Sequence, residues 1–238
     1  MDMDTLQIDD LQFEVRRSAR RRSLEITVDR GGELILSVPT DCPDERLQDF
    51  VHRKRMWIYQ QLARKEATSV AVRPKEFVDG EGFAYLGRSY RLRLVPPEES
   101  TAAVKLVGGR FVMPSTFAPE GSMHLIRWYT DRARPWLAHK VKDYSARMEV
   151  DPTGVRVQDL GYRWGSCGKG DWLYFHWKTI LLPAPIVEYV VVHEMAHLHE
   201  PHHTPAFWRR VERAMPDHER RRVWLEGHGL EVEGLKQD

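Results

Sequence analysis

Two histidines and a glutamate lie close together in an apolar stretch of this 238-residue chain. They are His193, Glu194 and His197, in the segment IVEYVVVHEMAHL. Positions four residues apart fall on one face of an α-helix, because the helix has about 3.6 residues per turn. Two such imidazoles can share one zinc ion, and the glutamate between them can reach the water that the ion holds. The spacing predicts a catalytic metal centre of the HExxH type.

The helix that would carry these residues is apolar almost all round, which is typical of a buried helix. Its apolar members are Ile186, Val187, Tyr189, Val190, Val191, Val192, Met195, Ala196 and Leu198. Ionisable groups in such surroundings are costly unless a metal or close partners compensate them. This setting favours a functional site over a chance motif on a solvated helix.

A catalytic zinc ion usually takes three protein ligands, so a third is expected beyond the helix. Pro201 disfavours helical geometry at Glu200, and we expect the helix to end there and the chain to turn back. That turn can bring His203 to the metal, which makes His203 the predicted third ligand. The alternatives are His202, Glu212 and, less favoured, Glu200.

The segment GYRWGSCGKGDWLYFHWKTILLP, ahead of the helix, reads as a β-hairpin with a turn at residues 168–170. A strand beside a metal helix can pair with an extended substrate. Gly165 would allow close backbone approach, and Arg163 and Lys178 could receive an anion. We expect the aromatic residues here to be mainly core, and Cys167 to be a small apolar residue rather than a nucleophile.

The remaining pattern predicts an α+β protein with a β-rich N-terminal half and a helix-rich C-terminal half. Strands are expected at residues 11–16, 23–29 and 33–38, with a turn at Gly31 and Gly32, and then a helix over 44–65. A second β-rich stretch covers 76–95 and 102–114. Helices are expected over 124–148, 206–214 and 216–227. The segment at 117–122 marks the predicted boundary between domains 1–118 and 119–238, and no internal repeat is visible.

Composition excludes several classes of protein. Lys plus Arg number 36 and Asp plus Glu 35, so the net charge of +1 gives no general attraction to nucleic acid or membrane. Two distant cysteines, Cys42 and Cys167, do not form a disulfide framework and fit a reducing compartment. The N-terminus lacks an apolar signal core, and no apolar run is long enough to span a membrane. We expect a soluble cytoplasmic protein.

One basic run stands apart from this balance. VRRSARRR places Arg16, Arg17, Arg20, Arg21 and Arg22 within seven residues. Such a run could bind phosphate, nucleic acid or an acidic peptide. A solvated hairpin protected by charge explains it equally well.

The assembled motifs resemble the YgjP-like family of bacterial metal-dependent hydrolases, which are relatives of the SprT-like and WLM-type zincins. The similar segments are VRRSARRRSLEITVD, DGEGFAYLGRSYRL, RWGSC, YFHWKTILLP, VVVHEMAHLHEPHHTPAFW and PDHERRRVWL. The resemblance implies a zincin-like catalytic half packed with the β-rich half, metal ligands at His193, His197 and His203, and Glu194 as base.

Two positions depart from the family pattern. His176 stands where the family usually has Asn, and Lys178 where it usually has Arg. If those side chains orient the substrate, the specificity of this protein differs from that of its relatives.

These observations predict a zinc-dependent hydrolase that cleaves peptides or proteins with metal-activated water, Glu194 serving as general base. The alternative is a metal-dependent pyrophosphatase of nucleoside triphosphates such as UTP, because the family carries both labels. A second alternative is a non-catalytic adaptor with a structural metal that binds protein or, through Arg16–Arg22, nucleic acid. One zinc ion is expected, although histidine ligands suit other divalent transition metals.

Overall fold

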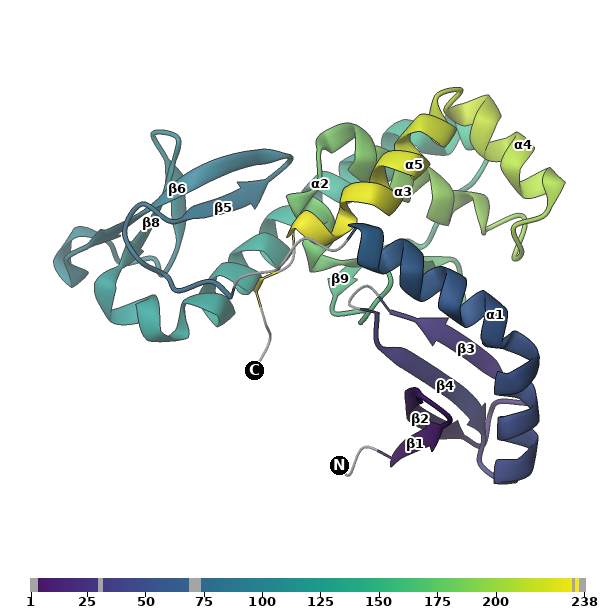
Figure 1. Cartoon of the computed structure of the whole chain (residues 1–238). Helices are drawn as coiled ribbons and strands as arrows, with labels where there is room; N and C mark the ends of the chain where they lie inside the picture. Colours follow the sequence, from purple (N-terminus) through teal and green to yellow (C-terminus); the bar gives the residue numbers. More distant parts are fainter. Residues whose placement is uncertain (1–3, 30–31, 69–73, 233, 236–238) are drawn as a thin grey trace. The chain divides into compact units, whose positions relative to one another are not determined.

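Four strands and one long helix form the first part of the chain, in a computed structural model that describes residues 4–29, 32–68, 74–232 and 234–235. The strands are β1 (Asp4–Ile8), β2 (Leu11–Ser18), β3 (Glu25–Val28) and β4 (Leu34–Pro39), and the helix is α1 (Asp44–Thr68) (Figure 1). The sheet order is β1-β2-β4-β3. Alternate strand residues such as Phe13 and Leu36 are buried with Leu47, Val51 and Ile58 of the helix, because one face of each element is apolar.

The predicted strands and helix of this region are confirmed, and β1 is an additional edge strand. The antiparallel pairing of β3 with β4 is the predicted hairpin. Gly32 adopts a φ of 91°, which suits glycine in a turn, whereas Gly31 lies outside the described residues.

A second four-stranded sheet follows, made of β5 (Gly82–Tyr85), β6 (Arg88–Val95), β7 (Lys105–Val107) and β8 (Arg110–Pro114). A short 3-10 turn, η1 (Pro97–Glu99), follows β6, and a second one, η2 (Ser115–Glu120), joins β8 to the long helix α2 (Gly121–Met148). The hydroxyl of Tyr129 on α2 donates to the carbonyl of Ala84 at 2.7 Å. Sheet and helix therefore share one core, to which Phe83, Phe111 and Leu125 belong.

The two four-stranded sheets have the same topology. In each, the first pair is antiparallel, the central pair parallel and the last pair antiparallel, and the order β5-β6-β8-β7 matches β1-β2-β4-β3. Each first hairpin also has a non-glycine residue at positive φ, Asp9 at 54° and Leu86 at 48°. The structure thus contains a repeat that the sequence does not reveal, because a shared topology needs similar burial patterns rather than identical side chains.

A three-stranded sheet carries the predicted hairpin. Its strands are β9 (Gly154–Gln158), β10 (Gly165–Cys167) and β11 (Trp172–His176), in the order β10-β11-β9. β10 and β11 pair antiparallel, as the sequence predicts, whereas β9 pairs parallel to β11. Residues 155–177 are therefore a hairpin plus a third strand.

Helices complete the C-terminal half. After η3 (Trp177–Leu181) come α3 (Ala184–Ala196), α4 (Pro205–Ala214), α5 (His218–His228) and η4 (Gly229–Val232). The predicted α+β class is confirmed by strands that dominate the N-terminal half and helices that dominate the C-terminal half. No helix within the described ranges has an apolar stretch that would traverse a lipid bilayer.

Chain contacts divide the protein into two units, residues 1–71 and 72–238. The predicted boundary between residues 118 and 119 falls inside the second unit, and the division into domains 1–118 and 119–238 stays a prediction. Helix α2 packs on both sides of that position: Tyr129 contacts Phe111 of β8 and also Trp177 of η3.

Charged side chains hold the N-terminal part of α3 between two other helices. Glu188 of α3 pairs with Lys140 of α2, at 2.8 Å between Nζ and Oε1, and lies 3.6 Å from Arg221 of α5. Arg221 also donates to the carbonyl of Pro185 at 2.7 Å. The helix that carries the HEMAH motif is thus fixed at its start by polar contacts and along its length by apolar packing.

We predict that Gly87→Ala destabilises the second unit more than Gly80→Ala. Both glycines have positive φ, at 76° and 85°, so each alanine would cost about 1 kcal/mol in backbone strain. Only at Gly87 would the new Cβ lie 2.7 Å from the Cα of Pro183, which adds about 1–3 kcal/mol of overpacking. Denaturant unfolding of the two variants checks this. Equal losses of unfolding free energy in the two variants would show that Pro183 causes no steric penalty for a Cβ at position 87.

Candidate metal centre

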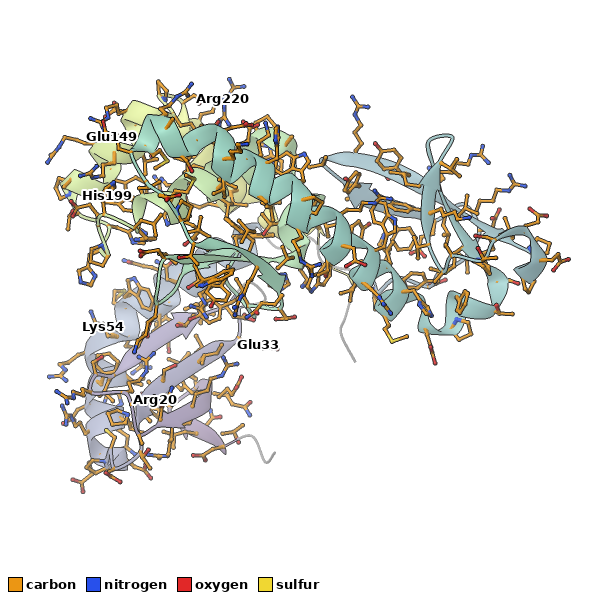
Figure 2. All side chains as sticks on the ribbon, turned by 180° about the vertical axis from the view of Figure 1, so that it is seen from behind. Arg20, Glu33, Lys54, Glu149, His199 and Arg220 are labelled. Atoms are coloured by element: carbon orange, nitrogen blue, oxygen red, sulfur yellow. The ribbon has the colours of Figure 1, made fainter. Side chains whose placement is uncertain are left out.

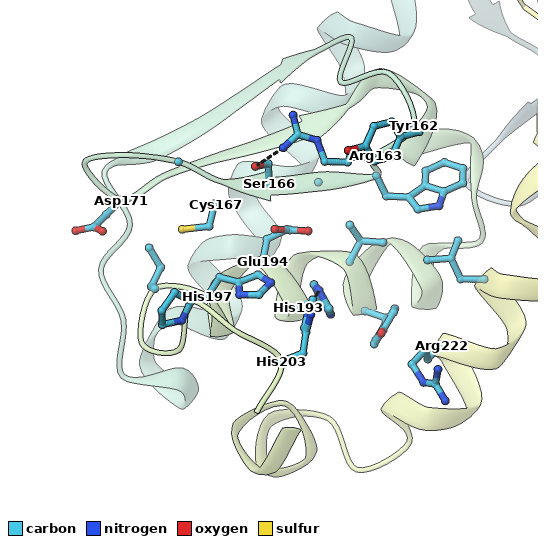
Figure 3. Close-up of a pocket in the computed structure, with 18 of the residues that line it drawn as sticks. Tyr162, Arg163, Ser166, Cys167, Asp171, His193, Glu194, His197, His203 and Arg222 are labelled. Carbon is cyan, nitrogen blue, oxygen red and sulfur yellow. Dashed lines mark hydrogen bonds between the residues drawn. The ribbon is translucent and has the colours of Figure 1, made fainter. Parts of the chain in front are cut away.

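The three predicted histidines come together in the structure. The ligand nitrogens of His193, His197 and His203 all lie within 4.8 Å of one another, and the Nε2 atoms of His193 and His203 are 2.9 Å apart (Figure 3). α3 ends at Ala196, but His197 keeps helical backbone angles (φ −67°, ψ −16°), so the two histidines of the motif share one helix face.

The imidazoles have the chemistry of metal ligands. Burial, followed by the neighbouring His203 and His197, lowers the pKa of His193 to about 3, so this ring is neutral. Nδ1 of His197 lies 3.0 Å from the carbonyl oxygen of Glu200. A carbonyl only accepts, so Nδ1 donates in this contact and Nε2 is the nitrogen left to bind a metal. Imidazole nitrogens that converge in this way fit a divalent transition metal.

The turn that delivers His203 begins earlier than the sequence indicates. The helix α3 ends at Ala196, whereas the sequence places its end at Glu200. The amides of Leu198 and His199 donate to carbonyls three residues back, those of Met195 and Ala196, and these bonds tighten the last turn ahead of Pro201. The next helix then begins at once: the hydroxyl of Thr204 accepts from the amide of Phe207 at 3.3 Å, an N-cap that also has proline at the first helical position. His203 lies in the short segment between the two helices.

The alternative ligands lie elsewhere. His202 is exposed and Glu212 is exposed on α4, and neither belongs to the cluster. His199 turns away, with its Nε2 3.2 Å from the carbonyl of Glu149 (Figure 2). Glu200 contacts the cluster through its backbone, because its carbonyl oxygen accepts a hydrogen bond from Nδ1 of His197.

Phe207 is a part of the site that the sequence reasoning missed. Its ring is fully buried and lies 5.0, 4.6 and 4.7 Å from the ring centres of His193, His197 and His203. The signal was present in TPAF, where the Thr-Pro helix start places an apolar residue at the N-terminus of α4 beside the histidine turn.

Glu194 lies beside the histidine cluster and is only 7% exposed. Burial raises the pKa of its carboxyl to about 8, against opposing effects from Arg163 and a backbone hydrogen bond with Cys167. Gly165 of β10 makes room for it: a Cβ at that position would lie 2.5 Å from Cγ and 2.7 Å from Oε1 of Glu194. In the structure, the backbone at Gly165 therefore approaches the side chain of Glu194 closely.

A cleft of about 950 Å³ opens over the cluster. It is bordered by one face of α3, by residues 162–171 around β10, and by α5 (Figure 3). Arg163 and Gly165 line it, and the guanidinium of Arg163 donates to the hydroxyl of Ser166 at 3.3 Å. Cys167 also lines it, and burial raises the pKa of its thiol, which fits a residue that is not a nucleophile.

The other two predicted substrate contacts are not among the described residues that line the cleft. His176 is buried at the end of β11, where its Nδ1 accepts from the amide of Lys178 at 3.0 Å and its Nε2 lies 3.5 Å from Asp159. Lys178 places its ammonium over the ring of Trp177. A role in substrate binding stays a prediction for both.

The basic run lies in the first unit, where acidic side chains pair with several of its members. Arg16 contacts Glu14 at 2.6 Å, and Arg21 contacts Glu25 at 2.7 Å. Arg17 joins Asp4 and Asp44 at 3.3 and 3.2 Å. These ion pairs of partly exposed side chains are compatible with a solvated hairpin protected by charge. Nucleic-acid binding through Arg16–Arg22 stays a prediction.

A histidine cluster that could hold a metal ion, beside a buried glutamate in a cleft, is an arrangement found in metal-dependent hydrolases. Residues 22–228 match the family described as YgjP-like, metallopeptidase domain. The match covers most of the chain, and the chain belongs to the YgjP-like family. Comparison with curated proteins and with solved structures gives no match.

We predict that His203→Ala weakens metal binding strongly whereas His202→Ala leaves it unchanged, because only His203 belongs to the cluster. Removing one of three ligands leaves two imidazoles, which bind zinc more weakly than the three that a catalytic site usually has. Zinc stoichiometry and affinity, measured after chelation and reloading, check this. Equal losses in the two variants would contradict the assignment of His203.

Proposed function

We propose that this protein is a zinc-dependent peptidase that hydrolyses peptide bonds, with Glu194 as the general base. The observation that supports this most directly is the carboxyl of Glu194, buried against Gly165 beside the three histidines and at the wall of the cleft. His193, His197 and His203 would hold the ion, which, when bound, acidifies a water molecule and polarises the scissile carbonyl.

Glu194 acts twice in the proposed reaction. It takes a proton from the water whose oxygen forms the new bond to the carbonyl carbon, and it then gives that proton to the amine nitrogen as the C–N bond breaks. Gly165 holds the carboxyl in place because the backbone of β10 packs directly on it. A glutamate in this position argues against a purely structural metal, since closed structural sites do not need a base.

The substrate is proposed to bind as an extended strand along β10. This strand ends the sheet order β10-β11-β9, and its residues line the cleft. An edge strand offers unpaired backbone groups that an extended peptide can match. Arg163, exposed just before β10, can receive a carbonyl or carboxylate oxygen of that peptide.

A nucleoside triphosphate is the alternative substrate. Arg163 and Lys169 line the cleft and are exposed, so two cations are available for phosphate oxygens. A cytoplasmic location stays a prediction.

We predict that Glu194→Gln retains zinc but loses peptide hydrolysis by about 10²-fold or more, because the amide cannot accept the proton of the attacking water. Hydrolysis of an unfolded protein substrate such as casein, at matched zinc content, measures this. Turnover by a clean Glu194→Gln preparation at the wild-type rate would remove the glutamate from the mechanism.

Release of pyrophosphate from UTP by the same two preparations separates the two substrate classes. Activity in the wild type that disappears in Glu194→Gln, without peptide hydrolysis, would make the protein a nucleotide hydrolase. Peptide hydrolysis without pyrophosphate release supports the proposal.

A second variant tests the packing of the base. Gly165→Ala should lower peptide hydrolysis by about 10²-fold, the scale lost when catalytic geometry shifts by an ångström, while zinc binding by the histidines persists. Gly227→Ala is the matched control, since its Cβ meets nothing within 4 Å and it lies inside α5. Wild-type activity in Gly165→Ala would show that Glu194 does not depend on this contact.

A further inference from the structure

His203 is the exposed member of the histidine cluster, and it lies on the turn between α3 and α4. His193 and His197 are held by the helix that carries them, but a side chain on a turn keeps more rotamers unless packing restricts it. A third ligand that samples several rotamers would weaken the site, because the binding of a metal would first have to order it. The contacts of His203 therefore decide how well the three nitrogens converge.

The ring of Trp208 provides such a contact. It stacks with the imidazole of His203 at 5.8 Å between ring centres, with 24° between the ring planes. Trp208 is five residues further along the chain, in the first turns of α4, and also lines the cleft. Its contact with His193 is less parallel, at 6.0 Å and 63°. Among the three histidines, His203 is thus the one that stacks on Trp208.

Trp208 is itself supported from α5. It stacks with His218 at 5.9 Å and 24°. The Nδ1 of His218 lies 3.2 Å from the carbonyl of Met215, in the turn before α5, which fixes this imidazole in turn. A chain of stacked rings therefore joins the start of α5, the α4 helix and the exposed histidine.

From this geometry we infer that Trp208 is a positioning residue that holds His203 in the orientation required for metal binding. The inference rests on the proposed metal site. It adds a residue outside the HEMAH motif that sets the affinity for the ion and the arrangement of ligands around it. Residues that orient metal ligands typically contribute about 10- to 100-fold to metal affinity.

The test is the affinity for Zn²⁺ of Trp208→Leu, measured by competition with a chromophoric chelator. We expect binding about 10- to 100-fold weaker than in the wild type, with most of the affinity restored in Trp208→Phe, which keeps a flat ring. Trp224→Leu is the matched control, because Trp224 stacks on His228 at 4.7 Å and is not among the described residues that line the cleft. It should bind Zn²⁺ as the wild type does.

A double-mutant cycle with His203→Ala separates positioning from a general effect on the fold. If Trp208 acts through His203, Trp208→Leu weakens Zn²⁺ binding in the wild-type background and has little effect in the His203→Ala background. The visible absorption of the Co²⁺-loaded protein should also change in Trp208→Leu, because those bands report the coordination around the ion. Trp224→Leu should leave the spectrum unchanged.

Two results would overturn the inference: wild-type Zn²⁺ affinity in Trp208→Leu, or the same loss of affinity in both backgrounds. These results are distinct from failure of the proposed function. A wild-type protein that binds no Zn²⁺ would contradict the metal site itself, whereas a protein that binds Zn²⁺ and cleaves no peptide would leave the role of Trp208 standing.

Discussion

The contact between β10 and α3 is the constraint on which the site depends. A carboxyl in an apolar helix is costly to bury, and Glu194 is accommodated because Gly165 has no side chain and the backbone of β10 can approach it. The same approach places an edge strand along the face of α3 that carries His193 and His197. The burial of the Glu194 carboxyl and the position of β10 at the wall of the cleft thus follow from one close packing contact.

Other residues of the second unit fix the positions of β10 and α3 relative to each other. His176 of β11 donates its amide to the carbonyl of Trp164, and the hydroxyl of Thr179 donates to the same carbonyl, so the chain just before β10 is anchored twice. The turn between β5 and β6 donates two amides to carbonyls of η3, the segment that leads into α3. Glu188 then ties α3 to its neighbours. The placement of β10 and α3 therefore relies on contacts made by residues outside the histidine cluster.

Local patterns predicted the elements of this protein well. Alternating apolar residues located β2, β3 and β4, and the second β-rich stretch covered β5 to β8 without resolving the single strands. The helices α1 to α5 lie close to where the sequence predicted them, and the glycines around residue 168 located the β10–β11 hairpin. Parallel pairing was beyond reach, because the partner of a parallel strand lies far along the chain and leaves no turn signal. For this reason the pairing of β9 with β11 and the repeated topology of the two larger sheets emerge only in the structure.

The sequence by itself determined which residues can do chemistry: HEMAH sets two histidines and a glutamate on one helix, and Pro201 enforces a turn after it. Only the tertiary structure decided which of the nearby histidines and carboxylates completes the cluster, and that Phe207 and Trp208 support it. It also decided that Lys178 packs on Trp177 rather than lining the cleft. Spacing along the chain specifies neighbours within one element, whereas contacts between elements depend on how their apolar faces pack.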